Sequence, residues 1–327
     1  FDLNLTTLKL RKRWLDHHII GLANAIFTVP AEELHTSFSE TTRRRLFGPI
    51  PTLLLQLAAG NPQRAQDITV SLYLQLLGHN KHKYLIFYMG QGHNGKSLLI
   101  TLLREALGEL SAPLHKSILF GGKETSSHSG FQIQLDSIRS GFMDDLGTRD
   151  VFNEQAVKMI VSPDVEMVMR EAGHTRRGAA KARFRIGCSL VLACNYGAMP
   201  QIQMDQALVN RFRMIPFDAT FVHADSVEGK PGYYKAEPGL LDKLKQPHHL
   251  SHFINYIVLA GRHYYDRNIR QHGEPLINER QMQEDLEKML IPIGEEQLRS
   301  PSSSLVSFPS PSRSSSSTFQ HWWDTHV

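Results

Sequence analysis

The segment Gly90-Gln91-Gly92-His93-Asn94-Gly95-Lys96-Ser97 constrains this chain more than any other feature. It fits the pattern G-x-x-x-x-G-K-[ST], in which a glycine-rich loop holds the phosphates of a nucleotide. An apolar run, residues 84–88, precedes the segment, and leucines at helical spacing follow it until Gly108. Strand, loop and helix therefore come in the order that a phosphate-binding loop requires.

Each residue type in this loop has a separate chemical role. The glycines let backbone N–H groups converge on the β-phosphate at the positive end of the helix dipole. Lys96 places a mobile charge on the β- and γ-phosphates, and Ser97 offers a hydroxyl to Mg²⁺. We therefore predict that Gly90 to Ser97 bind ATP, with Lys96 catalytic and Ser97 a metal ligand. The alternative is a fortuitous glycine turn.

Two polar strand ends further along the chain are candidate catalytic groups. Asp144 and Asp145 follow a short apolar pair, and we expect Asp144 to coordinate the metal, mostly through water, and Asp145 to orient the attacking water. These two roles could be reversed, and an acidic turn is the alternative. Asn195 ends the apolar run 189–194, where open α/β sheets bind ligands, and could contact the γ-phosphate or the attacking water. A turn-forming Asn is the alternative there.

Arginines and lysines supply two further candidates. Arg211 and Arg213 begin an apolar stretch, and either could project from a subunit edge into a neighbour's nucleotide site, although surface arginines are the default for this residue type. Residues 170–185 hold six cations and a single acid, and we expect an exposed, flexible loop that contacts DNA phosphates or is simply solvated. The DNA-binding candidates in it are Arg170, Arg176, Arg177 and Lys181.

The pattern of the whole chain predicts an α/β fold with helical flanks. Residues 1–80 are expected to be helical and collar-like, with Ser39 capping a helix near Glu40 and another helix over 64–77. Residues 81–221 alternate short apolar runs with helices, which is typical of an α/β core, and residues 222–298 return to helix. Residues 299–327 are expected to be a disordered tail rich in Ser and Pro.

Composition excludes several classes of protein. Only Cys188 and Cys194 are present, which excludes a disulfide scaffold and fits an intracellular, reducing compartment. We find no signal peptide and no apolar run long enough to span a membrane, so no membrane partner is expected. The 36 Lys and Arg against 32 Asp and Glu permit a polyanionic partner without requiring one. The chain begins with Phe1, which leaves open whether it is a fragment.

Together, these segments resemble superfamily 3 helicases, specifically the helicase portion of the helicase-primases of poxviruses, other large DNA viruses and phages. The resemblance covers roughly residues 40–290, and five motifs come in the family's order. The motifs are the Walker A loop at Asn94-Gly95-Lys96-Ser97, Walker B at Asp144-Asp145, B-prime at Val157-Lys158-Met159-Ile160 with Asp164, motif C at Asn195 with Pro200, and the arginine-finger segment at Asp205, Arg211 and Ile215-Pro216-Phe217.

The resemblance implies a P-loop ATPase core of AAA+ type, with ATP and Mg²⁺ bound, in a ring that is commonly a hexamer. It implies translocation on single-stranded DNA and unwinding of forked DNA at sites of viral or phage-like replication. It also implies DNA contacts from Lys158 and the basic loop, Arg211 as a finger, and a primase domain or subunit as a further partner. The alternative is an ATP-binding, ring-forming DNA-binding module without unwinding. A small-molecule kinase is disfavoured by the basic loop and the helical flanks.

Overall fold

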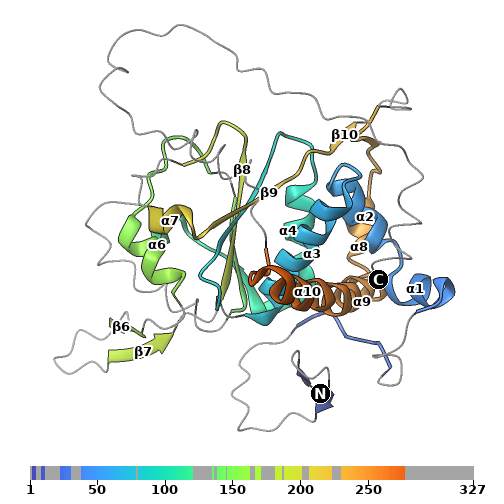
Figure 1. Cartoon of the computed structure of the whole chain (residues 1–327), viewed down its shortest axis with the longest axis horizontal. Helices are drawn as coiled ribbons and strands as arrows, with labels where there is room; N and C mark the ends of the chain where they lie inside the picture. The colour runs from blue at the N-terminus through green and yellow to red at the C-terminus, as the bar shows by residue number, and fades with distance from the viewer. Residues whose placement is uncertain are drawn as a thin grey trace, which may run out of the picture.

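A five-stranded parallel sheet lies at the centre of the structure (Figure 1). Its strands lie in the order β4 (Ser111–Pro113), β5 (Ser140–Met143), β8 (Ser189–Asn195), β3 (Leu85–Gly90) and β9 (Phe212–Pro216). The strand before the phosphate loop, β3, therefore has β8 on one side and β9 on the other. Because all five strands run the same way, their carboxyl ends share one edge of the sheet, which is where ligands bind in such folds.

This computed structural model describes residues 2–4, 9–11, 23–30, 38–78, 80–120, 135, 138–144, 146–162, 166–170, 181–185, 188–200, 206–222 and 230–276. For residues 2–4, 9–11, 166–170, 181–185 and 206–207, the description covers the backbone alone.

Both faces of the sheet are buried. On β3, Ile86 and Tyr88 belong to one hydrophobic cluster, whereas Leu85 and Phe87 belong to the cluster on the other face. Strand β8 divides in the same way, because successive side chains of a strand point to opposite faces. Burial on both faces is the reason that these strands read as continuous apolar runs in the sequence.

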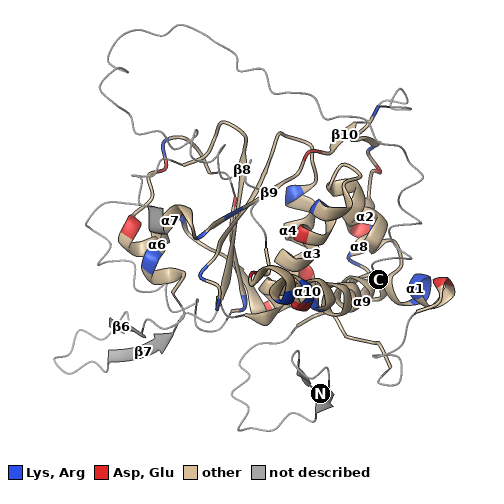
Figure 2. Ribbon diagram, viewed as in Figure 1, with Lys and Arg blue, Asp and Glu red and all other residues tan. Residues whose placement is uncertain are grey.

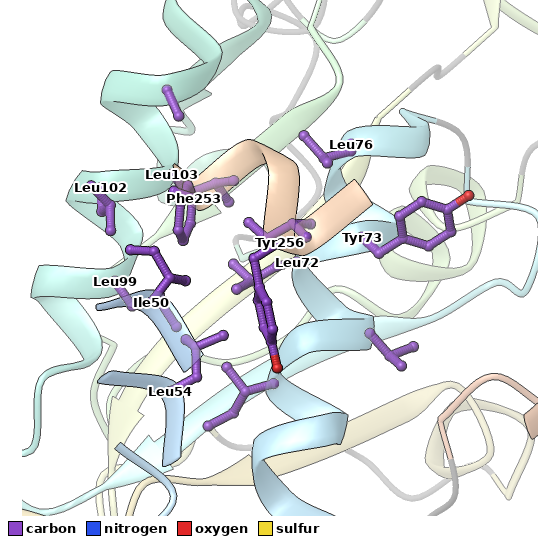
Figure 3. Close-up of a cluster of buried hydrophobic side chains, with 14 of the residues drawn as sticks. Ile50, Leu54, Leu72, Tyr73, Leu76, Leu99, Leu102, Leu103, Phe253 and Tyr256 are labelled. Carbon is purple, nitrogen blue, oxygen red and sulfur yellow. The ribbon is translucent and has the colours of Figure 1, made fainter. Parts of the chain in front are cut away.

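Helices from early and late in the chain cover one face together (Figure 1). The helices of this layer are α1 (Glu40–Phe47), α2 (Ile50–Leu57), α3 (Pro62–Leu77), α4 (Lys96–Leu107), α8 (Leu240–Leu244), α9 (Pro247–Tyr256), the π-helical turn Ile257–Gly261 and α10 (Arg262–His272). Leu54 of α2, Leu72 of α3, Leu99 of α4 and Phe253 of α9 lie in one buried cluster (Figure 3). The helix that begins at the phosphate loop is thus packed between segments from both flanks.

Helix α3 is also fixed to the sheet by polar contacts at its carboxyl end. Arg139 Nη1 donates to the carbonyl of Leu76 at 2.7 Å, and the Ser189 hydroxyl donates to the carbonyl of Leu74 at 3.0 Å. These side chains satisfy helix-terminal carbonyls that would otherwise lack partners. They come from the starts of β5 and β8, so α3 is held against the amino ends of these strands.

The second face is covered by shorter elements. Helices α6 (Glu154–Ile160) and α7 (Gln206–Val209) and the 3₁₀ helix Lys116–Ile118 lie on this side, and a further 3₁₀ helix, Gly108–Leu110, follows α4. The Phe87 ring contacts the rings of Phe152 and Phe212, with centroids 6.2 and 5.0 Å away.

Three two-stranded sheets lie outside the central sheet. An antiparallel pair joins β1 (Asp2–Asn4) to β2 (Lys9–Arg11), and another joins β6 (Glu166–Arg170) to β7 (Lys181–Arg185). Strands β10 (Thr220–Val222) and β11 (Tyr233–Lys235) pair in parallel. Figure 1 shows the β6–β7 hairpin apart from the layer of helices α1 to α4.

Most expected elements are confirmed. The three expected strands are β3, β5 and β8; Ser39 caps α1 by accepting from the Thr42 N–H at 3.2 Å; and Gly108, with a φ of 55°, ends α4. Three expectations are wrong. Residues 2–4 and 9–11 are strands rather than helix, and the ends of the basic segment 170–185 belong to a hairpin rather than a loop. The region 222–298, expected to be helical, also contains the strand β11.

The boundaries 1–80, 81–221 and 222–298 stay predictions, although the described helices of the two flanks share one hydrophobic core with the sheet. The tail 299–327 lies outside the described residues. Within the ranges given above, no helix has the length and apolar character needed to cross a membrane.

Candidate active site

The phosphate loop joins β3 to α4 at the carboxyl edge of the sheet. Gln91, Gly92 and His93 are exposed, and Gly95 precedes α4 with a φ of 82°. A Cβ at Gly95 would lie 2.3 Å from Leu57 Cδ2, so glycine is needed both for the backbone conformation and for the space. Exposed backbone that leads into a helix amino terminus is a suitable site for an anionic phosphate.

Lys96 is buried, and its ammonium group is turned back onto the loop. Its Nζ lies 3.0 Å from the carbonyl oxygen of Gly90, 3.1 Å from that of Gln91 and 3.1 Å from Asn94 Oδ1. Burial lowers the pKa of Lys96 below its usual value. Ser97, the next residue, is exposed, so its hydroxyl is accessible to a metal ion or a nucleotide.

Asn195 lies beside the phosphate loop because of the strand register. Gly90 and Asn195, the last residues of β3 and β8, are direct partners in the sheet. Asn195 Oδ1 accepts a hydrogen bond from Lys96 Nζ at 3.2 Å, and the N–H of Tyr196 donates to the Gly90 carbonyl at 3.3 Å. The sheet therefore brings two of the predicted catalytic residues into contact.

The acidic pair follows β5, which adjoins β8 rather than β3. Asp144 is exposed and comes directly after Met143, at the same edge of the sheet as Asn195. With β8 between β5 and β3, Asp144 is two strand spacings, roughly 10 Å, from the loop strand. Such a separation suits a carboxylate that reaches a bound metal through water. Asp145 lies outside the described residues.

The two arginines of the β9 segment differ in their surroundings. Arg211 is half-buried at the amino-terminal edge of the sheet, where its carbonyl accepts from the Leu85 N–H at 2.9 Å. Its Nη1 has no hydrogen-bond partner among the described residues. About five residues of β3, or roughly 17 Å, separate this edge from Gly90. Arg211 is therefore remote from the phosphate loop of its own chain.

Arg213 does not project from the surface. Its side chain is buried, Nη2 pairs with Glu274 Oε2 at 2.7 Å, and the guanidinium lies 4.1 Å from the centre of the Tyr84 ring. Arg213 Nη1 also donates to the carbonyls of Asn210 and Phe212. These contacts leave Arg213 no freedom to enter a neighbouring subunit, so the interpretation of Arg213 as a projecting arginine is wrong.

Of the predicted DNA-binding residues, Lys158 lies on α6, Arg170 on β6 and Lys181 on β7. Lys158 pairs with Glu154 one turn earlier on α6. Arg170 and Lys181 are direct partners at the last described positions of the β6–β7 hairpin. Arg176 and Arg177 lie outside the described residues.

A polar cluster beside the loop was missed by the sequence reasoning. Asp218, just beyond β9, pairs with Arg64 of α3 and accepts a hydrogen bond from the Tyr196 hydroxyl at 2.9 Å. Burial, together with the neighbouring Asp218 carboxylate, raises the pKa of Tyr196. Tyr196 and Asp218 could have been found from their places at strand ends, but the sequence around Arg64 gives no such signal.

The described part of the chain contains no group of three or more His, Cys, Asp or Glu that could hold a metal ion alone. A Mg²⁺ ion at this site would therefore depend on the exposed Ser97 hydroxyl and on Asp144, with nucleotide and water completing its ligands.

Two viral proteins named as helicases are similar to part of this chain. The chain is 27% identical over 183 residues to Putative helicase 022R of Frog virus 3 (isolate Goorha), which covers 54% of this chain and 18% of the relative. It is 25% identical over 155 residues to Putative helicase 184R of Invertebrate iridescent virus 6, which covers 46% of this chain and 15% of the relative. The chain thus spans less than a fifth of either relative.

Among solved structures, the A form of the NrS-1 C-terminal region is similar with a TM-score of 0.48 and 13% identity, over 77% of this chain and 54% of that one. No protein-family model matches the chain.

Proposed function

We propose that this chain is an ATP-dependent DNA helicase of superfamily 3, which translocates on single-stranded DNA during replication. The observation that carries the proposal is the contact between Lys96 Nζ and Asn195 Oδ1 at 3.2 Å. A charged phosphate-loop lysine and a polar strand end that meet in this way are the parts that position a γ-phosphate and an attacking water. The two viral relatives named as helicases support the same activity.

The strand order supports the AAA+ type of core. Strand β3, which carries the phosphate loop, lies between β8, which carries Asn195, and β9, which begins just after Arg211. Arg211 is then too far from its own loop to act there, and we propose that it serves a neighbouring subunit. A ring, commonly a hexamer, is the assembly in which each subunit supplies this arginine to the next.

In this proposal ATP lies along the loop Gly90 to Ser97. Ser97 and Asp144 hold Mg²⁺, which when bound supplies positive charge against the phosphate oxygens. Lys96 moves from the loop carbonyls to the phosphates, while Asn195 and Asp145 orient the attacking water. Arg211 of the adjacent subunit stabilises charge on the transferred group.

The DNA strand is proposed to run along the β6–β7 hairpin. Contacts to phosphates from Lys158, Arg170, Arg176, Arg177 and Lys181 would bind the backbone with little sequence preference. Because the chain spans only part of its viral relatives, a primase partner and action on forked DNA are proposals for the whole protein.

The experiment that tests this function measures ATP hydrolysis with and without single-stranded DNA, and unwinding of a labelled fork. We expect DNA to stimulate hydrolysis and the fork to open only when ATP is present. Nucleotide-dependent assembly and DNA binding without unwinding would favour a ring-forming module instead. ATP consumption that does not depend on DNA and that transfers the γ-phosphoryl group to a small molecule would exclude both.

A further inference from the structure

Asn94 occupies one of the unspecified positions of the phosphate-loop pattern, yet the residue is buried, with 3% exposed. Its amide does not face the exposed surface of the loop, as that of a nucleotide-contacting residue would. Asn94 Nδ2 donates to the carbonyl of Phe217 at 3.0 Å, and Asn94 Oδ1 accepts from Lys96 Nζ at 3.1 Å.

The space for this amide is created by Gly90. A Cβ at Gly90 would lie 1.9 Å from Asn94 Nδ2 and 2.5 Å from the Phe217 carbonyl oxygen. Glycine at the end of β3 therefore leaves room for a side chain of its own loop. The two contacts of Asn94 occupy opposite ends of one amide, and an uncharged amide is the side chain that both donates and accepts in this way.

The Phe217 carbonyl belongs to the segment just beyond β9. The same segment is held to β3 by the Phe217 N–H, which donates to the Met89 carbonyl at 2.7 Å. Asn94 therefore connects the Lys96 ammonium to the segment just beyond β9. Asn195 supplies the second side-chain acceptor for Lys96, from the strand on the other side of β3.

We propose that Asn94 is a positioning residue for ATP binding, which orients the Lys96 ammonium and fixes the phosphate loop to the end of β9. The inference rests on the proposed function of the loop and adds a role for a side chain that the loop pattern does not specify. It does not require Asn94 to touch the nucleotide.

Asn80 provides a matched control. It is also a buried asparagine, with 6% exposed, and it also both donates and accepts, since Nδ2 bonds to the Tyr84 carbonyl at 2.6 Å and Oδ1 accepts from the Tyr84 N–H at 2.8 Å. It precedes β3 and lies at the opposite edge of the sheet from the phosphate loop. Asn80→Ala therefore removes a buried asparagine and its local hydrogen bonds without changing the contacts of Lys96.

The experiment measures equilibrium binding of a fluorescent ATP analogue to the unmodified protein, Asn94→Ala and Asn80→Ala, each checked for folding by thermal unfolding. We expect Asn94→Ala to weaken binding about tenfold or more, as for loss of a hydrogen bond to a charged group. Asn80→Ala should bind as the unmodified protein does. Equal weakening in both variants, or none in Asn94→Ala, would overturn the positioning role.

Asn94→Asp is a second variant of the same size, which keeps an acceptor beside Lys96 but loses the donor to the Phe217 carbonyl. Because a phosphate-loop lysine reaches the β- and γ-phosphates, a misplaced Lys96 ammonium should weaken binding of an ATP analogue more than binding of an AMP analogue. A purely structural loss would weaken binding of both analogues to the same extent.

This difference between the two analogues should be absent in Asn80→Asp. Equal weakening of both analogues in Asn94→Asp would contradict the inference even if Asn94→Ala failed to fold. Absence of binding by the unmodified protein would refute the proposed function itself, whereas normal binding by both that protein and Asn94→Ala would refute only the role of Asn94.

Discussion

The amide oxygen of Asn195 lies 3.2 Å from Nζ of Lys96, although 99 residues separate them in the chain. The parallel register of β3 and β8 places the last residues of both strands side by side, so the contact follows from the sheet itself. It joins the residue that would neutralise phosphate charge to the residue that would orient water.

Removal of the Asn195 amide should slow hydrolysis while leaving ATP binding nearly normal. Asn195→Ala keeps the loop and three acceptors for Lys96, but it removes the polar side chain at the end of β8. We therefore expect ATP turnover to fall about a hundredfold. Steady-state hydrolysis and equilibrium binding measure the two effects. The control is Asn24→Ala, which removes an amide that donates to the Glu105 carbonyl at 2.9 Å. This variant should hydrolyse ATP at the normal rate. Equal losses of binding and turnover in Asn195→Ala would contradict this role.

Arg211→Ala should bind ATP nearly normally and hydrolyse it about 10³- to 10⁵-fold more slowly, as expected for an arginine finger. Lys96→Ala should be inactive for a different reason, because its own loop lacks the phosphate-binding charge. A mixture of the two should regain some activity, since an interface can then join an intact loop to an intact Arg211. Arg270→Ala, exposed on α10, is the control. A mixture that assembles but stays inactive would exclude action between subunits.

Arg213→Ala should lower stability rather than abolish chemistry. The change removes the ion pair with Glu274 and the contact with the Tyr84 ring from a side chain that is 8% exposed. We expect a loss of about 2 kcal/mol in the free energy of unfolding, measured by urea denaturation. Folded Arg213→Ala should keep most of its ATPase activity, and a selective loss of activity at unchanged stability would reverse the roles of Arg211 and Arg213.

Neutralising Arg176, Arg177 and Lys181 together should weaken DNA binding on every sequence to a similar extent. The slope of log K against log salt should become shallower by about 0.7 for each lost contact on single strands. Binding titrations at several salt concentrations on two unrelated oligonucleotides measure both effects. A loss confined to one sequence, or an unchanged slope, would show that the segment does not follow the DNA backbone.

Acid should loosen the packing of α1 against α9. Burial, together with repulsion from His248, lowers the pKa of His252 despite a hydrogen bond with the Arg45 backbone. Because the folded state binds the proton less well than the unfolded state, stability should fall as pH drops below about 6.5. Urea midpoints between pH 7 and 5 should decline less in His252→Gln than in the control His272→Gln, which changes an exposed histidine. Identical pH dependence in both variants would show that His252 does not cause the loss of stability in acid.

Local pattern predicted the loop, its flanking elements and the place of Asn195, because strand ends and helix caps are determined by nearby residues. Local pattern could not distinguish Arg211 from Arg213, because the difference depends on the ring of Tyr84 and on Glu274, which is 61 residues beyond Arg213. The side-chain role of Asn94 was hidden for the same reason, because its partner Phe217 is 123 residues away. The strands at residues 2–4 and 9–11 pair with each other, and helical spacing gave no sign of that pairing.

Helix α4 begins at the phosphate loop and ends inside a core to which α2, α3 and α9 also contribute (Figure 3). Its first turn contains Lys96 and Ser97, which depend on the helix for their placement. Figure 2 shows positions of charged residues along the ribbons of several surrounding helices. A substitution that destabilises that core, however far from the loop, therefore also destabilises the helix that carries the phosphate-binding residues. Substitutions at Leu72 or Phe253 would then produce temperature-sensitive proteins, active when cool and unable to hold nucleotide when warmed.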